Sequence, residues 1–279
     1  MESIHSSTSE ATTDFLRAVR SYENTGDGND RLWLDFTKKT DSIPWLKAHR
    51  DYVEANSLGF GDRAFHYNWY LILQHLRHLH PERPIRTLEI GVYKGQVISL
   101  WGLIAKELKI PVEVTAVSPL EGNFTPTVWT RVKILRSIRK RVDPVFKKRL
   151  KSGNMYREDD YEQIVRDFYT HLNLDFEKVR LLRGYSTQPE LVQAARERTY
   201  DLIYIDGDHR YEGVIHDLEK YAVHLPKGGL LVMDDGSYFL EGSKFWKGHK
   251  AVSEACRKIE GLGFVNRLNV GHNRVYERS

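Results

Sequence analysis

The chain of 279 residues is 41% hydrophobic and 29% charged, with a formal net charge of +4, a composition typical of globular domains with a sizeable core rather than of disordered chains. No apolar run approaches the roughly 18 to 20 residues of a membrane helix, and the polar N-terminus lacks the apolar core of a secretory signal. The single cysteine, Cys256, excludes an internal disulfide or a thiolate zinc cluster, so we expect it on the inner face of a helix in a cytoplasmic protein.

The first eighty residues divide into a tail and a helical layer. Residues 1–30 are rich in Ser, Thr, Glu and Gly, which predicts a disordered tail. Residues 31–80 have a helical pattern and are expected to form an N-terminal helical layer. Within this layer an apolar and aromatic stripe is expected to face the core: Phe65, Trp69, Leu73 and Leu76.

Strands and helices alternate from residue 81 to the C-terminus. Short apolar runs predict strands at 85–91, 112–118, 179–183, 201–206 and 229–234. The stretches after them predict helices at 95–108, 189–198, 212–224 and 247–260, and a final hairpin is expected over 264–268 and 273–277. This alternation predicts an α/β fold in one domain, residues 81–279: a Rossmann-like, doubly wound, mostly parallel seven-stranded sheet with an antiparallel C-terminal hairpin.

A helical insert is expected between the second and third strands, over about 119–177. Its segment 131–151 holds ten Lys or Arg residues against one acid, and five apolar positions are expected to face inward: Val132, Ile134, Leu135, Ile138 and Val142. The basic face could steer an anionic substrate or bind an acidic lipid surface. Nucleic acid is the weaker hypothesis, because no aromatic platform or zinc finger accompanies the charges.

Carboxylates follow the fourth and fifth predicted strands. Asp206 and Asp208 come after one strand, and Asp234 and Asp235 after the next. If the strands are parallel neighbours, these side chains meet at one edge of the sheet, where they repel each other unless a cation or a proton relieves them. Taken alone, each group could instead be a helix cap or a plain turn.

The turn after the first strand has the glycines of a ligand-binding loop. In Glu89-Ile-Gly91-Val-Tyr-Lys-Gly95, the first glycine permits a sharp turn and the second lets the helix start close to the strand. The free N–H groups of that helix suit a carboxylate or a phosphate. The G-x-G-x-x-G dinucleotide pattern is not matched, and Glu89 instead suits an ammonium or hydroxyl of the ligand.

Taken together, Glu89-x-Gly91-x-x-x-Gly95, the strand order, Asp206-Gly-Asp-His209, and Pro226-Lys-Gly-Gly followed by Asp234-Asp235 resemble class I S-adenosylmethionine-dependent methyltransferases. More narrowly, they resemble the branch of metal-dependent sugar O-methyltransferases and cephalosporin-hydroxylase-like proteins. The resemblance covers residues 60–279.

The resemblance implies roles for individual residues. The cofactor-binding residues would be Glu89, Gly91, Val92, Tyr93, Gly95, Ser118, Tyr185, Ser186 and Asp206. One divalent ion, Mg²⁺, would be held by Asp206, Asp234 and Asp235, whose hard oxygen ligands suit it. His209 is the first choice of general base because its unshifted pKa lies near neutrality, and Asp208 is the second. His66 and His249 are expected to lie outside the site.

Two positions depart from the family pattern. Ser118 stands where such enzymes carry an acid that binds the ribose hydroxyls, although Glu121 could reach round to them. Tyr185 follows the third strand where many relatives carry an aspartate, so it is expected either to stack on the adenine or to leave that contact unmade.

The predicted function is S-adenosylmethionine-dependent, Mg²⁺-assisted O-methylation of a hydroxylated small molecule such as a sugar or glycoside. The alternative is a non-catalytic methyltransferase-like domain that binds a partner or an anionic ligand through the basic insert. A third hypothesis, an oxygenase, lacks the two-histidine, one-carboxylate spacing in the sequence. The insert and the N-terminal helices are expected to select the substrate or to form the interface of a homo-oligomer.

Overall fold

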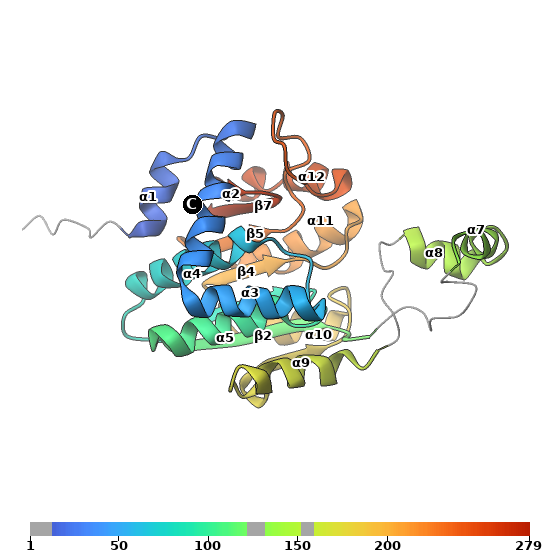
Figure 1. Ribbon diagram of the computed structural model, residues 1–279, viewed down its shortest axis with the longest axis horizontal. Helices are drawn as coiled ribbons and strands as arrows, with labels where there is room; N and C mark the ends of the chain where they lie inside the picture. The colour runs from blue at the N-terminus through green and yellow to red at the C-terminus, as the bar shows by residue number, and fades with distance from the viewer. Residues whose placement is uncertain (1–12, 122–131, 152–158) are drawn as a thin grey trace, which may run out of the picture.

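A single seven-stranded sheet lies at the centre of the computed structural model, which describes residues 13–121, 132–151 and 159–279 (Figure 1). The strands are β1 (Ile85–Ile90), β2 (Val112–Ser118), β3 (Arg180–Arg183), β4 (Leu202–Ile205), β5 (Leu230–Met233), β6 (Phe264–Val270) and β7 (Asn273–Arg278). Their order is β3-β2-β1-β4-β5-β7-β6. The first five strands are parallel, and β7 runs antiparallel to both β5 and β6. The predicted fold class is confirmed.

Helices cover both faces of this sheet. One layer contains α3 (Pro44–Asn56), α4 (Arg63–Leu79), α5 (Gln96–Leu108) and α9 (Tyr161–His171), and the other contains α10 (Pro189–Arg196), α11 (Tyr211–Lys220) and α12 (Lys250–Cys256). Single 3₁₀ turns lie at Phe176–Lys178, Ala222–His224 and Glu260–Leu262. A hydrophobic core lies on each face of the sheet, one beneath each layer of helices. Successive side chains of a strand point to opposite faces, so Tyr204 belongs to the core beneath α4 and α5, while Ile203 and Ile205 belong to the core beneath α11 and α12.

The structure differs from the sequence prediction at the start of the chain. Residues 13–30 are not a tail, because they contain α1 (Asp14–Ser21) and the first turns of α2 (Gly26–Ser42). Thr13 and Thr25 cap these helices by accepting backbone N–H groups, and Phe15 is buried with 1% of its surface exposed. A few apolar side chains and two caps outweigh the polar composition, and the part of the predicted tail before residue 13 lies outside the described residues.

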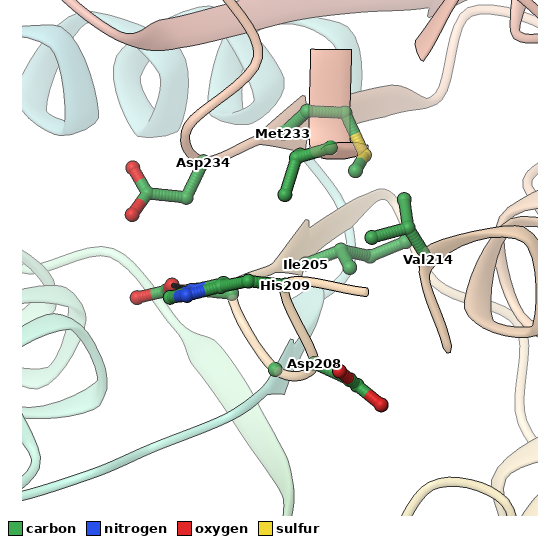
Figure 2. Close-up of a pocket in the computed structure, with 9 residues that line it drawn as sticks. Ile205, Asp208, His209, Val214, Met233 and Asp234 are labelled. Atoms are coloured by element: carbon green, nitrogen blue, oxygen red, sulfur yellow. Dashed lines mark ion pairs between the residues drawn. The ribbon is translucent and has the colours of Figure 1, made fainter. Parts of the chain in front are cut away.

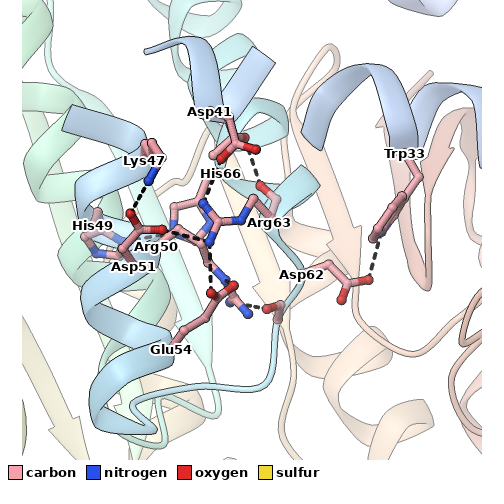
Figure 3. Close-up of polar contacts among 12 residues, drawn as sticks. Trp33, Asp41, Lys47, His49, Arg50, Asp51, Glu54, Asp62, Arg63 and His66 are labelled. Atoms are coloured by element: carbon pink, nitrogen blue, oxygen red, sulfur yellow. Dashed lines mark hydrogen bonds and ion pairs between the residues drawn. The ribbon is translucent and has the colours of Figure 1, made fainter. Parts of the chain in front are cut away.

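Arg63, at the start of α4, ties three N-terminal helices together (Figure 3). Its guanidinium donates to Asp41 at the end of α2 over 2.7 Å, and to Asp51 and Glu54 on α3 over 2.8 Å each. Arg is suited to such branched contacts with carboxylates. These contacts therefore fix α2, α3 and α4 to one another.

The basic insert contains α7 (Lys133–Val142) and α8 (Pro144–Lys151), which stand away from the sheet in Figure 1. The expected inward face is wrong, because Val132, Ile134, Ile138 and Val142 are 45%, 73%, 41% and 72% exposed. The first core cluster is made of residues from other elements, among them α3, α4, α5 and α9, and it does not include these four side chains.

Two further expectations about the core are confirmed. Phe65, Trp69, Leu73 and Leu76 are all buried on the inner face of α4, and Cys256 is buried in α12, where burial raises the pKa of its thiol to about 12. Among the described residues, no helix combines the length and the apolar character needed to cross a membrane.

Candidate active site

The loop from Gly91 to Gly95 joins β1 to α5 in a tight turn. Both glycines have left-handed backbones, with φ of 95° and 84°. A Cβ atom on Gly91 would lie 2.0 Å from the carbonyl oxygen of Asp206, so only glycine lets β1 end this close to the loop after β4. This sequence of a strand, a glycine turn and a helix start matches what a cofactor loop requires.

Val92 and Tyr93, which follow the first of these glycines, point in different directions. Val92 is buried in the core, whereas the ring of Tyr93 lies 5.4 Å from that of Phe60 and 5.6 Å from that of Tyr161. Tyr93 thus lies among aromatic side chains beside the loop. The roles of Val92 and Tyr93 as cofactor contacts stay predictions.

Glu89, the penultimate residue of β1, has a buried carboxyl group. Its side chain is 2% exposed, and its Oε2 atom has no hydrogen-bond partner among the described residues. Burial, reinforced by the charge of Asp206, raises the pKa of Glu89 well above its ordinary value. A buried acceptor without a partner is unfavourable by about 1–3 kcal/mol, so an ammonium group or hydroxyl of a ligand would be bound strongly here.

The carboxylates after β4 and β5 do meet at one edge of the sheet. Ile205 and Met233 are register partners in parallel strands, so Asp206 and Asp234 follow side by side. Burial, followed by the charges of Asp206 and Asp235, raises the pKa of Asp234 well above its ordinary value. The crowding that the sequence predicts is present, and it favours a bound proton or cation.

Two residues of the C-terminal hairpin contact the carboxylate of Asp234. Asn273 donates to its Oδ1 atom over 2.7 Å, and His272 Nε2 lies 3.4 Å from the same oxygen. The other ring nitrogen of His272 is 3.8 Å from Asp62, which accepts a 2.9 Å hydrogen bond from Trp33 (Figure 3). The N-terminal helices and the hairpin therefore position this carboxylate together.

Asp235 is held in a strained turn by its surroundings. Its φ of 54° is left-handed, which is uncommon for a non-glycine residue. Its backbone carbonyl accepts hydrogen bonds from the His249 N–H at 3.1 Å and from Ser253 at 3.2 Å. Its carboxylate lies 3.3 Å from His249 Nε2 and accepts a 3.4 Å hydrogen bond from Trp246.

The loop that carries Trp246 and His249 is fastened to α2. Asp30 accepts a hydrogen bond from Ser243 over 2.6 Å and another from the next backbone N–H over 2.8 Å. The rings of Trp33 and Phe245 stack with centroids 4.0 Å apart. The segment that the sequence suggested to be disordered thus contributes to the shape of the site.

His209 lies between the carboxylates of the two strand ends. Its Nε2 atom is 3.6 Å from Asp206 Oδ1 and 3.6 Å from Asp235 Oδ2. Burial by itself lowers the pKa of His209, but contact with Asp206 and the charges of Asp235 and Asp208 outweigh burial and raise the pKa above its ordinary value. Figure 2 shows His209 and Asp234 directed toward the same side of a small cavity.

Asp208, the second predicted base, points away from this group (Figure 2). Its carboxylate accepts hydrogen bonds from the Arg210 side chain, with a Nε–Oδ2 distance of 2.8 Å, and from the Arg210 backbone at 2.9 Å. Because the Asp208 carboxylate is engaged by Arg210 and directed away from the other carboxylates, the geometry favours His209.

The predicted adenosine contacts gather at the ends of β2 and β3. Tyr185 donates a 2.7 Å hydrogen bond to Glu121, and Ser118 is buried with its hydroxyl accepting a 3.3 Å bond from a backbone N–H two residues on. The carbonyl of Ser186 accepts a 2.7 Å bond from a tyrosine hydroxyl. A carboxylate thus stands at this edge although no acid ends β2, and the adenosine roles stay predictions.

Sequence reasoning placed His249 outside the site, and the structure corrects this. The rings of His249 and His209 stack with centroids 4.6 Å apart. His272 and Asn273 were also missed, because they reach the site only through the pairing of β7 with β5. The position of His249 just before the helix that follows β5 was the one available signal. His66, in contrast, is buried in α4 and bonds to His49 at 2.9 Å.

Two overlapping sets of side chains among the described residues have the spacing of a metal site. One is Asp234, Asp235 and His272, and the other is His209, Asp235 and His249, and in each set one donor atom per residue lies within 4.8 Å of the others. The carboxylates suit Mg²⁺. The second set is a two-histidine, one-carboxylate group. The sequence shows no such spacing, and the fold brings the three residues together.

Comparison with known proteins places this geometry in a family. A methyltransferase-domain family matches residues 88–236, from β1 to the turn after β5. An uncharacterized protein of Acanthamoeba polyphaga mimivirus is 49% identical over 35 residues, which are 12% of this chain and span only 16% of the length of that protein.

Solved structures share the fold at low identity. A putative caffeoyl-CoA O-methyltransferase from Staphylococcus aureus has a TM-score of 0.54 at 15% identity, covering 88% of this chain and 100% of that one. A calicheamicin methyltransferase has a TM-score of 0.52 at 15% identity, covering 93% and 96%. An O-methyltransferase from Bacillus cereus in complex with SAH has a TM-score of 0.51 at 13% identity, covering 88% and 98%. With more than half of its residues matched by the family and with this sheet, the chain belongs to the methyltransferase-domain family.

Proposed function

We propose that this protein transfers the methyl group of S-adenosylmethionine to a hydroxyl oxygen of a small molecule, such as a sugar or glycoside, with the help of Mg²⁺. The observation that carries the proposal is the convergence of two groups at one sheet edge. One is the buried carboxyl of Glu89 with its unpartnered oxygen. The other is the set of carboxylates beside His209.

Glu89 is suited to the amino end of the methyl donor. The ammonium group of the methyl donor would supply the partner that Glu89 Oε2 lacks. The turn at Gly91 and Gly95 would let the carboxylate of the methyl donor approach the start of α5. On the adjacent strand ends, Tyr185 and the Glu121 carboxylate that it bonds would contact the adenosine. These contacts would fix the direction of the sulfonium methyl group, and alignment is the main need of a direct displacement.

Asp206, Asp234 and Asp235 would offer carboxylate oxygens to a hard divalent cation, and the pKa of Asp234 is raised by burial and by the charges of the other two. Of the three, Asp234 and Asp235 belong to one set with metal-site spacing, which His272 completes. Bound there, Mg²⁺ would lower the pKa of a substrate hydroxyl. His209 would accept the proton of that hydroxyl, and Asp206 and Asp235 would stabilise the resulting imidazolium. The acceptor oxygen would then bond to the methyl carbon as the carbon–sulfur bond breaks.

The base and the cation together favour an oxygen acceptor. An alcohol has a high pKa, so its oxygen becomes a strong nucleophile only when a cation and a base assist removal of its proton. A neutral amine needs no such assistance. We therefore assign the site to O-methylation.

Calorimetry with S-adenosylmethionine, with and without Mg²⁺, tests the proposal at its first step. We expect micromolar binding that Glu89→Ala weakens at least tenfold and that Glu107→Ala, an exposed substitution on α5, leaves unchanged. Absence of binding under both conditions would sink the enzyme and leave the alternative of a non-catalytic domain that uses its basic insert.

Transfer of a labelled methyl group to a panel of sugars, glycosides and catechols tests the second step. Asp206→Ala and Asp234→Ala should abolish transfer and its response to Mg²⁺, and the Asp234→Ala protein should still bind the methyl donor. A variant of either residue that stays fully active without added metal would disprove the metal assignment.

A further inference from the structure

Three nitrogen and oxygen donors converge on the open side of the proposed site. Asp235 Oδ2 lies 3.3 Å from His249 Nε2 and 3.6 Å from His209 Nε2. Donor atoms bound about 2.0–2.2 Å from a tetrahedral metal ion lie about 3.3–3.6 Å apart. The separations from the shared carboxylate oxygen to each imidazole already match that spacing.

The donors are held in place by their neighbours. Trp246 donates to Asp235 Oδ1 over 3.4 Å, which leaves Oδ2 facing the two histidines. The backbone of His249 bonds to that of Asp235, and Gly236 and Gly248 form a bridge that closes the loop between them. A Cβ atom on Gly248 would lie 2.3 Å from the Asp235 backbone, so this approach depends on glycine. Supports of this kind preorganise a metal site.

The charges at this point favour a metal ion over a purely structural contact. Both imidazoles direct Nε2 toward the same carboxylate oxygen of Asp235. Because the two rings stack 4.6 Å apart, they would repel each other if both were protonated. A divalent ion would use all three lone pairs at once. Imidazole nitrogen suits Zn²⁺, Co²⁺ and Ni²⁺, whereas Mg²⁺ prefers oxygen.

We propose that His209, Asp235 and His249 form a site for a divalent transition-metal ion such as Zn²⁺, which overlaps the carboxylate site for Mg²⁺ at Asp235. The consequence rests on the proposed function: a metal ion on His209 Nε2 takes the lone pair that would accept the substrate's proton. Because Asp235 belongs to both donor sets, the two ions also compete. Zn²⁺ should therefore act as an inhibitor of the Mg²⁺-supported reaction.

Metal binding to the metal-free full chain tests the site directly. We expect Co²⁺ to give an intense visible absorption of a low-coordinate nitrogen and oxygen site, and Zn²⁺ to displace it in stoichiometric amount. His249→Ala should weaken Zn²⁺ binding by at least about 10- to 100-fold. Altering a residue that merely supports a metal ligand has that effect, and removing a ligand should have no smaller one. The matched control is His78→Ala, which removes an exposed histidine of α4 and should bind Zn²⁺ like the parent protein.

Equal Zn²⁺ affinity of the His249→Ala and parent proteins would overturn the site. So would a weak Co²⁺ spectrum typical of six oxygen ligands. These readouts need no methyl transfer, so they stand even if the proposed function fails. With activity in hand, Zn²⁺ should inhibit the parent protein at concentrations at least tenfold lower than those that inhibit His249→Ala.

Discussion

The imidazole of His249 lies against that of His209, with ring centroids 4.6 Å apart and planes inclined by 27°. The contact joins the loop after β4 to the loop after β5, two segments that the parallel sheet brings to one edge. It leaves His209 with carboxylates at its Nε2 atom and an aromatic neighbour on its face. Such packing fixes the orientation of a ring that must present one nitrogen to a substrate.

Replacing His209 with Gln should lower the rate of methyl transfer by about 10²- to 10⁴-fold, the usual contribution of a general base. The affinity for S-adenosylmethionine should stay within twofold, because His209 belongs to the acceptor side of the site. Single-turnover rates and calorimetry measure the two quantities. Asp208→Asn serves as the comparison, and a greater loss of rate in that variant would move the base to Asp208.

Binding of S-adenosylmethionine should weaken as the pH falls. The pKa of Glu89 is raised by burial and by the charge of Asp206, so the free protein keeps a proton on Glu89 to a higher pH than an ordinary glutamate, and in that range an incoming ammonium group must expel it. Affinity therefore rises with pH until Glu89 is ionised in the free protein. Calorimetry in buffers of different ionisation enthalpy should detect proton release, and Glu89→Gln should remove both the release and the pH dependence. Affinity that is flat with pH in the parent protein would contradict this.

Replacing Asp30 with Ala should loosen the loop that carries Trp246 and His249. The change removes the acceptor of two hydrogen bonds, 2.6 and 2.8 Å long, and should destabilise the fold by about 1–3 kcal/mol. Thermal melting measures the loss, and limited proteolysis should show faster cleavage within residues 237–247. Asp27→Ala, at an exposed position of the same helix, is the control, and equal cleavage of both variants would show that the contact does not hold the loop.

The protein should lose stability in mild acid through two histidines buried between α3, α4 and α5. Burial is the main cause that lowers the pKa of His49 to about 3 and that of His66 well below its ordinary value. The unfolded chain takes up protons on these residues near pH 6.5, so the stabilising contribution is complete above that pH and is lost as the pH falls toward 3.

Urea unfolding between pH 7.5 and 5 measures this effect. Each histidine should contribute a slope of at most about 1.4 kcal/mol per pH unit below its unfolded pKa. His49→Gln should flatten the slope and His78→Gln should not. His49 bonds to His66 at 2.9 Å and to Ser99 at 3.1 Å, so the Gln variant is also expected to be less stable at pH 7.5.

The sheet and the acidic strand ends could be predicted because they depend on local signals. Short apolar runs ending in glycine or aspartate predict buried parallel strands whatever surrounds them, and the bounds of β2, Val112–Ser118, agree with the prediction to the residue. Once the strands are parallel, the meeting of Asp206 with Asp234 follows from the register.

The remaining parts of the site depend on contacts between distant segments. His272 and Asn273 reach Asp234 through the antiparallel β7, and His249 reaches Asp235 because a glycine permits close backbone approach. Neither relationship leaves a periodic pattern in the sequence. The exposure of Ile134 on the basic insert shows the same limit, since an amphipathic pattern predicts an apolar face without saying what covers it.

The attachment of α2 to the loop before α12 has a practical consequence for shortening this chain. Gly26 lies so close to the loop that a Cβ atom there would be 2.2 Å from the Glu241 carbonyl oxygen, and Asp30 follows one turn later. A truncation at residue 30 or 31, where composition alone would place the domain start, would cut through this junction and release the side chains around Asp235. Any shortened version of the protein must therefore begin before Thr13, and an affinity tag belongs ahead of that residue.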